Sequence, residues 1–322
     1  MALDDATAAW LEELRRIRPQ PITELTPAQA REQAAAARAQ RAPGPEMAKV
    51  RNSRVKVAGG AIPVRVYRPT EQPAGVIVYY HGGGFVLGSI EDSDALSRHL
   101  AQRTGCTVMS VGYRLAPEFR YPTAVEDSWA ALVWADQHIT ELAGGRVPLI
   151  VAGDSAGGNL AAVVARRSAQ DHDAADPSLQ VALQILVYPV TDCDPDCLSY
   201  TDPANQLMLT AGSMGWFWDH YAPDVLARQH PDAAPLRAPV LSGLPPAVII
   251  TAEHDVLRDE GELYATRLMK AGVPVRFRRF DGQMHGFFGM TGILPGAEAG
   301  LDYVADAVAA QLGVEGRTHV TA

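Results

Sequence analysis

A serine flanked by glycines occurs near the middle of the chain, in Gly153-Asp154-Ser155-Ala156-Gly157. The motif follows an apolar run and precedes an alanine-rich one, which is the strand–turn–helix context of a Gly-x-Ser-x-Gly nucleophile elbow. A strand that turns abruptly into a helix crowds its flanks, so glycine is needed on both sides. The serine hydroxyl would then project from the carboxyl end of a sheet, where open α/β folds bind ligands. A chance match or a phosphate-binding turn is the alternative, but the sequence has no Gly-x-Gly-x-x-Gly or Gly-x-x-x-x-Gly-Lys-Ser/Thr motif.

Three consecutive glycines end an earlier apolar segment, in residues 81–85 (His-Gly-Gly-Gly-Phe). Glycine lets the backbone approach a substrate closely, with its amides pointing into the pocket. Attack of a serine on an acyl group places negative charge on the carbonyl oxygen, and backbone amides stabilise that charge. We therefore expect an oxyanion hole made by the N–H groups of Gly83, Gly84 and Ala156. The alternative, a flexible loop, is less attractive beside the serine motif.

A base for the serine is available in His285, which lies just after the last predicted strand. The carboxylate that orients this histidine is expected between the serine and the histidine, because enzymes with this elbow run in the order Ser, Asp or Glu, His. Asp255, which follows a strand predicted over 246–251, is our candidate, with Glu253 and Asp259 as rivals. Asp259 suits a helix start, where a carboxylate meets unpaired amides.

The other histidines have simpler interpretations. His81 belongs to the glycine run and is expected to order it. The rest are expected to be exposed to solvent on helices, tails or an inserted segment: His99, His138, His172, His220, His230, His254 and His319.

Apolar strands alternate with helices through most of the chain. Strands are expected at 55–57, 62–67, 75–80, 106–112, 147–153, 181–188, 246–251 and 275–280, and helices at 93–104, 124–138, 156–169, 261–271 and 299–312. Such an alternation indicates an α/β fold with a mostly parallel sheet that is flanked by helices on both faces. A closed eightfold barrel would need more strand–helix units than the chain shows.

Two segments depart from this alternation and predict a division of the chain into four parts. Residues 1–50 are rich in helix-favouring residues, and residues 189–238 hold Pro, Asp and aromatic residues without a clear strand. We expect 1–50 to be the N-terminal helical part of a cap and 189–238 a cap insertion over the top of the sheet. Residues 51–188 and 239–322 are then the first and second parts of the catalytic core.

The composition is that of an ordinary globular protein. The 322 residues carry 28 Lys and Arg against 37 Asp and Glu, a formal charge of −9, which argues against nucleic-acid binding. No apolar stretch reaches the roughly 18 residues of a membrane helix, and the first residues do not resemble a signal peptide. Three cysteines are too few for an extracellular disulfide framework. We expect a cytoplasmic protein with no stable membrane association, no metal and no cofactor.

These motifs in combination resemble the hormone-sensitive-lipase-like branch of the α/β-hydrolases, the bacterial family IV carboxylesterases. The matching segments lie within about residues 50–315: 81–84 (HGGG), 113–118 (YRLAPE), 153–159 (GDSAGGN), 255–261 (DVLRDEG, with valine where the family has proline) and 285–287 (HGF). The resemblance implies the α/β-hydrolase fold, a triad of Ser155, Asp255 and His285, and the oxyanion hole named above. It also implies a helical cap built from N-terminal helices and an insertion after the strand that ends at Tyr188.

The resemblance implies a serine carboxylesterase for small carboxylic esters with an acyl-enzyme on Ser155, and we expect esters with short acyl chains. An aryl-amide or carbamate hydrolase with the same triad is an alternative. A non-catalytic ligand-binding receptor on this fold is disfavoured by His285, which such receptors lack. By position, the substrate pocket is expected to be lined by Phe85, Asp154, Tyr188, Met208 and Phe287. An aromatic cluster at 215–221 is expected either to pack inside the fold or to line this pocket as well.

The last predicted strand, 275–280, is expected at an edge of the sheet. In relatives such an edge pairs across a dimer, so we expect a homodimer through this strand. Arg276, Arg278 and Arg279 could instead protect an edge that faces solvent.

Overall fold

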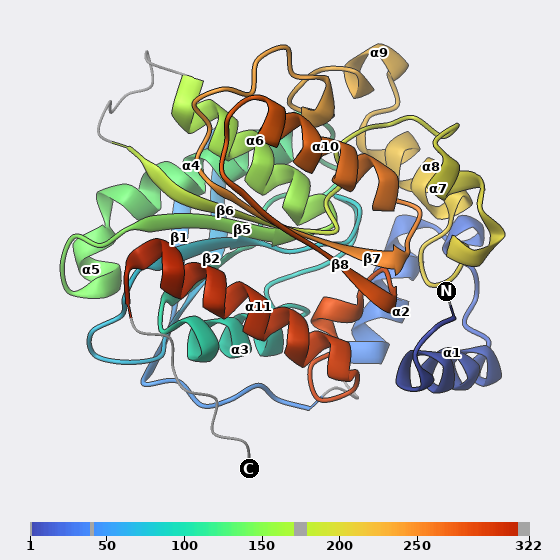
Figure 1. Cartoon of the computed structure of the whole chain (residues 1–322), viewed down its shortest axis with the longest axis horizontal. Coiled ribbons are helices and arrows are strands. Elements are labelled where there is room, and N and C mark those ends of the chain that lie inside the picture. The colour runs from blue at the N-terminus through green and yellow to red at the C-terminus, as the bar shows by residue number, and fades with distance from the viewer. Residues whose placement is uncertain (1, 39–41, 171–178, 315–322) are drawn as a thin grey trace.

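The computed structural model describes residues 2–38, 42–170 and 179–314, and these residues form one sheet of eight strands (Figure 1). In the spatial order β1-β2-β4-β3-β5-β6-β7-β8, the strands are β1 (Lys49–Val57), β2 (Gly60–Arg68), β4 (Thr107–Val111), β3 (Val76–Tyr80), β5 (Leu149–Asp154), β6 (Val181–Val187), β7 (Ala247–His254) and β8 (Val275–Met284). The pairs β1–β2 and β2–β4 are antiparallel, and the pairs from β4 to β8 are parallel. The predicted mostly parallel α/β sheet is confirmed.

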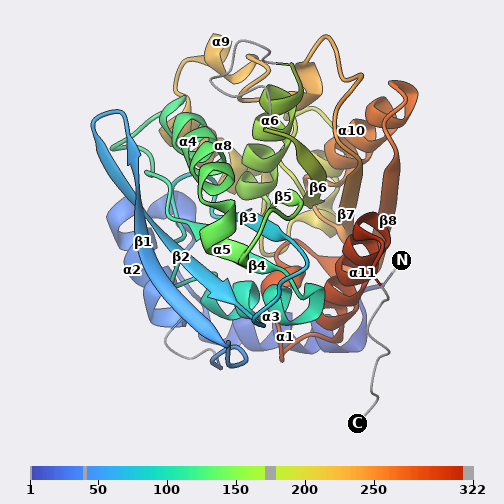
Figure 2. The same cartoon turned by 90° about the vertical axis from the view of Figure 1, so that its left-hand side faces the viewer.

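Helices cover the two faces of the sheet in separate layers, as Figure 2 shows. One face carries α4 (Thr123–Gln137), α6 (Ala156–Gln170) and α10 (Arg258–Lys270), and the other carries α3 (Asp94–Thr104) and α11 (Pro295–Leu312), while the short α5 (Ile139–Ala143) follows α4. Alternate residues of β3 enter the two hydrophobic cores: Val78 and Tyr80 pack in one, and Ile77 and Tyr79 in the other. In the described part of the chain, we find no helix with the length and apolar character needed to cross a membrane.

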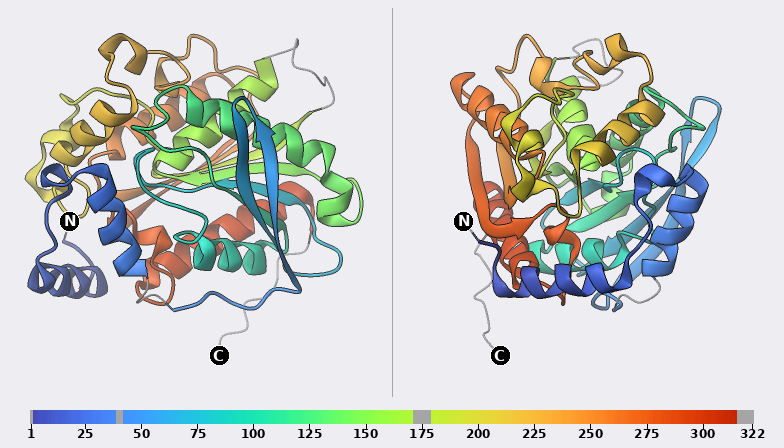
Figure 3. Two further views of the ribbon diagram at one scale, coloured as in Figure 1. Left: turned by 180° about the vertical axis from the view of Figure 1, so that it is seen from behind. Right: turned by 90° about the vertical axis from the view of Figure 1, so that its right-hand side faces the viewer.

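The carboxyl ends of the parallel strands are covered by helices from two distant parts of the sequence. These are α1 (Asp5–Ile17) and α2 (Pro27–Arg38) from the N-terminal part, and α7 (Leu198–Thr201) and α8 (Ala211–Tyr221), followed by α9 (Val225–Arg228), from the segment after β6. The right-hand panel of Figure 3 looks onto this end, where the blue N-terminal helices lie beside the yellow and orange segment. Any side chain that projects from the ends of the strands is therefore beneath these helices.

Strands β7 and β8 extend further at their carboxyl ends than the sequence predicts. The pattern predicts strands over 246–251 and 275–280, but β7 continues to His254 and β8 to Met284. Because His254 pairs with Met284 in the ladder, its side chain is buried, and the expectation that it is exposed to solvent is wrong. His172 and His319 lie outside the described residues.

A buried carboxyl group fastens the chain after β6 to helix α10. Glu260 lies in the first turn of α10 and is 3% exposed, and one of its oxygens accepts the N–H groups of Thr191 (2.7 Å) and Asp192 (3.2 Å). Burial away from water raises the pKa of this carboxyl to about 8. The folded protein therefore keeps a proton on Glu260 at neutral pH, whereas a carboxyl in the unfolded chain, with a pKa near ~4.3, has lost it.

We expect the free energy of unfolding to fall between about pH 5 and pH 8 on account of Glu260. Its raised pKa means that the folded state binds more protons than the unfolded state in this range, so the contribution is complete at low pH and is lost as the pH rises through about 8. Glu260→Gln keeps an oxygen for both N–H groups but cannot ionise. The free energy of unfolding of this variant should therefore fall less between the two pH values than that of the parent. Urea unfolding of both proteins at the two pH values measures this, and an equal change in both would contradict it.

Candidate active site

The turn between β5 and α6 holds Ser155 in a backbone conformation that few residues adopt. Its φ is +54°, in the left-handed region, and its N–H donates to the Val187 carbonyl at 2.8 Å. A Cβ on Gly153 would lie 2.2 Å from the Gly157 carbonyl oxygen, and a Cβ on Gly157 would lie 1.9 Å from the Tyr80 carbonyl oxygen. The crowding that the sequence predicts at both glycines is therefore present, and it keeps Ser155 at the apex of the turn.

Ser155 lies at one end of a hydrogen-bonded relay with His285 and Asp255. Nε2 of His285 is 3.1 Å from Oγ of Ser155, and Nδ1 of His285 is 2.7 Å from Oδ2 of Asp255. The other carboxylate oxygen of Asp255 accepts the Leu257 N–H at 2.9 Å, and the Asp255 side chain is fully buried. When Nδ1–H donates to Asp255, Nε2 of the neutral imidazole is free to accept the serine proton.

Neighbouring strands bring the two downstream residues of this relay together. His254 at the end of β7 pairs with Met284 at the end of β8, so the next residue of each strand, Asp255 and His285, emerges beside the other. The ring of Tyr188, at the end of β6, packs against the imidazole of His285 with ring centroids 4.5 Å apart. The imidazole is thus held by a carboxylate on one side and an aromatic ring on another.

The two rival carboxylates have other partners. Glu253 accepts the Gly282 N–H at 2.8 Å. Asp259 meets an unpaired amide, as expected, but that amide is the Ser199 N–H in α7 (3.0 Å) and not one in its own helix. The reason is that α10 begins at Arg258, so Asp259 is already inside the helix and its side chain faces α7. The carboxylate that reaches the histidine is therefore the candidate preferred from the sequence.

The glycine loop after β3 contains one strained residue, Phe85, and carries unpaired donors. Gly83, Gly84 and Phe85 have φ values of +116°, +59° and +63°, and such values are unfavourable for a residue with a side chain. Among the residues that the structure describes, no protein acceptor receives the N–H groups of Gly83, Gly84 or Ala156. Unpaired backbone donors beside a serine are what an oxyanion hole requires.

Polar contacts tie this loop to the serine turn and to the strand beneath it. The Gly82 N–H donates to Oδ1 of Asp154 at 2.9 Å, and the Tyr79 hydroxyl donates to the same oxygen. Nδ1 of His81 is 2.8 Å from the Gly82 carbonyl, and its ring stacks on Tyr113 with centroids 4.4 Å apart. Burial lowers the pKa of His81, which favours the neutral imidazole. Asp154, expected to line the pocket, uses its carboxylate to hold the glycine loop.

The other residues expected to line a pocket differ in what they expose. Met208 is 40% exposed, and its methyl group lies against Gly286, next to the candidate histidine. Phe85 and Tyr188 are almost fully buried. Phe287 is fully buried in the core, with its ring 5.2 Å from that of Phe280, because the chain turns inward after β8. Like that of Phe85 and Tyr188, the place of Phe287 in a substrate pocket stays a prediction.

Helix α8 packs aromatic side chains against the glycine loop. Phe85 stacks on Tyr221 with ring centroids 3.8 Å apart and ring planes 8° apart. Phe217 lies so close to Gly84 that a Cβ at that glycine would be 2.1 Å from its Cδ1. The sequence left open whether the aromatic cluster packs or lines the site, and these contacts place Phe217 and Tyr221 directly against the loop.

The described residues hold no group of three or more His, Cys, Asp and Glu side chains that could bind a metal ion. In the acidic run at 192–196, the side chain of Asp192 pairs with Arg237. The groups that the site itself presents for chemistry are a hydroxyl, an imidazole, a carboxylate and backbone amides.

Comparisons with known proteins identify the family of the chain. Residues 77–289 match the family model described as the alpha/beta hydrolase fold. The chain is 39% identical over 254 residues to an ethyl acetate hydrolase of Pseudomonas putida, covering 78% of this chain and 79% of the relative. It is 42% identical over 241 residues to carboxylesterase NlhH of Mycobacterium tuberculosis, covering 73% and 74%. The structure of a hyperthermophilic esterase from the archaeon Pyrobaculum calidifontis matches with a TM-score of 0.88 at 38% identity, over 96% of this chain and 99% of that one. The chain therefore belongs to the alpha/beta-hydrolase family, and it is a carboxylic ester hydrolase of the hormone-sensitive-lipase-like branch.

Proposed function

We propose that this carboxylic ester hydrolase cleaves small esters with short acyl chains through an acyl-enzyme on Ser155. The observation that carries the proposal is the relay in which Asp255 contacts His285 (2.7 Å) and His285 contacts Ser155 (3.1 Å). In this assignment Ser155 is the nucleophile, His285 the general base and acid, and Asp255 the group that orients the imidazole.

The reaction follows from these positions in two matched halves. Oγ of Ser155 bonds to the ester carbonyl carbon while its proton passes to Nε2 of His285, and the carbonyl oxygen becomes an oxyanion. The N–H groups of Gly83, Gly84 and Ala156 stabilise that charge, a contribution of about 3–4 kcal/mol for a single donor in comparable sites. His285 then gives its proton to the departing alcohol as the ester bond breaks. Water repeats the sequence on the acyl group and restores the serine.

The short acyl chain is supported by two observations. The Pseudomonas putida relative is named as an ethyl acetate hydrolase, and acetate is a two-carbon acyl group. In addition, the Phe217 and Tyr221 rings of α8 pack directly on the glycine loop, which limits the room beside the acyl carbon. Phe85, Tyr188, Met208 and Phe287 are the remaining candidates for contact with the substrate.

We propose that residues 1–50 and 189–238 act together as a cap over a core formed by 51–188 and 239–322. Contact between α8 and the 3-10 turn Ile22–Glu24 supports this grouping, because it joins the two segments over the carboxyl ends of the strands. Substrate entry would then depend on side chains from both segments.

The edge strand β8 supports the proposal of a homodimer. It is the last strand of the described sheet, and Phe277 is 37% exposed on it, an apolar side chain that a second copy would cover. Sedimentation equilibrium should give the mass of two chains for the parent and of one chain for Phe277→Asp. A monomeric parent would overturn the proposal and leave Arg276, Arg278 and Arg279 as protection for a solvent-exposed edge.

Hydrolysis of p-nitrophenyl esters of increasing acyl length tests the function. We expect kcat/KM to be highest for acetate and butyrate, and Ser155→Ala or His285→Ala to lower kcat by about 10⁴-fold or more, because each removes a group that takes part in bond formation. Activity that survives in Ser155→Ala would contradict the nucleophile. A parent that cleaves p-nitroanilides but no ester would favour the amide alternative.

Replacing Asp255 tests its assignment as the carboxylate that orients His285. Asp255→Asn keeps the shape of the side chain but no longer favours the tautomer in which Nε2 accepts a proton, and a comparable change in another triad costs about 10⁴-fold in kcat. Asp259→Asn, at the rival position, is the matched control and should lose less than about tenfold. Equal losses in the two variants, measured with acetate ester at saturation, would remove the distinction between Asp255 and Asp259.

A further inference from the structure

The glycine loop needs outside support to keep its conformation. Three successive residues, Gly83, Gly84 and Phe85, have φ values between +59° and +116°, and Phe85 has a side chain that disfavours this region. Within the loop, the Val86 and Leu87 N–H groups donate to the Gly83 carbonyl at 3.1 and 2.8 Å. A loop in this state persists only where its surroundings over-determine it.

Arg31, in the N-terminal helix α2, supplies part of that support. Its Nε donates to the Val86 carbonyl at 2.9 Å, and its Nη2 donates to the Ala116 carbonyl at 2.7 Å. Ala116 in turn donates its N–H to the Phe85 carbonyl at 2.9 Å. One guanidinium group therefore joins the glycine loop to the segment that follows β4, over a sequence separation of 55 residues to Val86.

Glu118 locks the guanidinium in this orientation. Its two carboxylate oxygens each accept from Arg31, at 2.8 Å from Nη1 and 2.8 Å from Nη2, which is the bidentate geometry that only a planar fork can make. Hydrogen bonding to Arg31 lowers the pKa of Glu118 to about 2. The Glu118 carboxylate therefore stays charged throughout the pH range in which an esterase with a histidine base works.

We propose that Arg31 is a positioning residue for ester hydrolysis: through the Val86 and Ala116 carbonyls it holds the glycine loop so that the Gly83 and Gly84 amides meet the oxyanion. The role rests on the proposed oxyanion function of these amides. Arg31 touches no reacting atom, so its effect passes through the loop.

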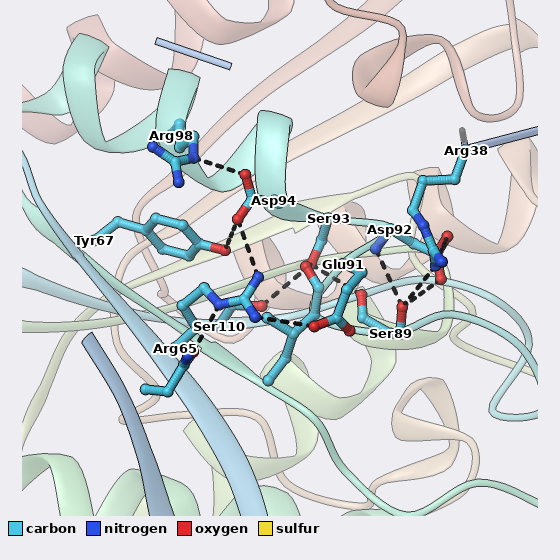
Figure 4. A network of polar contacts seen from close by, with 12 residues as sticks. Arg38, Arg65, Tyr67, Ser89, Glu91, Asp92, Ser93, Asp94, Arg98 and Ser110 are labelled. Carbon is cyan, nitrogen blue, oxygen red and sulfur yellow. Dashed lines mark hydrogen bonds and ion pairs between the residues drawn. The ribbon is translucent and has the colours of Figure 1, made fainter. Parts of the chain in front are cut away.

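Arg38, about two turns further along α2, is a matched control. Its side chain is 35% exposed against 30% for Arg31, and it also joins α2 to the core, through Asp92 (3.1 Å) and Ser89 (3.4 Å). Figure 4 shows these contacts, in which Arg38 reaches side chains after the loop rather than the backbone carbonyls of the loop. A variant at Arg38 therefore weakens the attachment of α2 without releasing the loop.

The kinetic test compares Arg31→Met, Arg31→Lys and Arg38→Met, with active sites counted by a fluorophosphonate that labels the serine. We expect Arg31→Met to lower kcat per active site by about 10- to 100-fold with KM changed less than about threefold, since the lost interaction acts in the transition state. A trifluoromethyl ketone, which forms a tetrahedral oxyanion adduct, should bind more weakly by the same factor. Arg31→Lys keeps the charge but not the planar fork, so its kcat should lie between those of the parent and Arg31→Met. The kcat of Arg38→Met should stay within about threefold of the parent value.

A structural measurement separates this inference from the proposed function. Hydrogen exchange of the Val86 and Leu87 amides should be at least about tenfold faster in Arg31→Met and unchanged in Arg38→Met, because only the first releases the loop. Unchanged exchange in Arg31→Met, or equal kinetic losses at Arg31 and Arg38, would overturn the positioning role. If the parent hydrolyses no ester while exchange still responds to Arg31, the proposed function fails and the hold on the loop stands.

Discussion

The close crossing of the backbone at Tyr80 and Gly157 is the constraint on which the site depends. Tyr80 pairs with Gly153 in the parallel ladder of β3 and β5, and a Cβ at Gly157 would lie 1.9 Å from the Tyr80 carbonyl oxygen. The two chains therefore leave the sheet side by side, one into the glycine loop and the other into the serine turn. A hydrogen bond from the Gly82 N–H to the Asp154 carboxylate also joins the start of the glycine loop to the serine turn. The hydroxyl and the amide donors are thus placed relative to one another by the main chain, and side-chain contacts then hold the glycine loop in that place.

The acid and the base reach the same place by a second pairing of parallel strands. Since His254 and Met284 are partners in the ladder, the residues that follow them emerge together. Strand β6 lies between the two pairs and connects them: the Val187 carbonyl accepts the Ser155 N–H, and the Tyr188 ring packs on the imidazole of His285. Helices α2 and α8 then complete the site from outside the sheet, one through a guanidinium group and the other through aromatic rings. The open α/β fold thus gathers groups from four strand ends at one edge.

The parts of this arrangement that depend on local sequence could be predicted, and those that depend on distant contacts could not. The glycines around Ser155 and the apolar runs that flank them predict a strand, a turn and a helix from neighbouring residues alone. By contrast, the burial of His254 and Phe287 depends on how far β7 and β8 remain paired, which the apolar pattern does not mark. The raised pKa of Glu260 arises from a segment far along the chain that covers it. Arg31 has no local signal at all, because an arginine on a polar helix is ordinarily a solvated residue.

Trapping the intermediate would show whether ester hydrolysis passes through an acyl group on Ser155, as we propose. The parent would be mixed with p-nitrophenyl acetate, quenched in acid within milliseconds, and examined by intact mass and peptide mapping. We expect one acetyl group per chain, located on the peptide that contains Ser155, together with a burst of p-nitrophenol of equal size when deacylation is the slower step. Two results would contradict the acyl-enzyme on Ser155. One is an acetyl group on another residue, such as the buried Ser199, whose hydroxyl donates to the Val256 carbonyl next to Asp255. The other is acetylation that persists in Ser155→Ala at the parental rate.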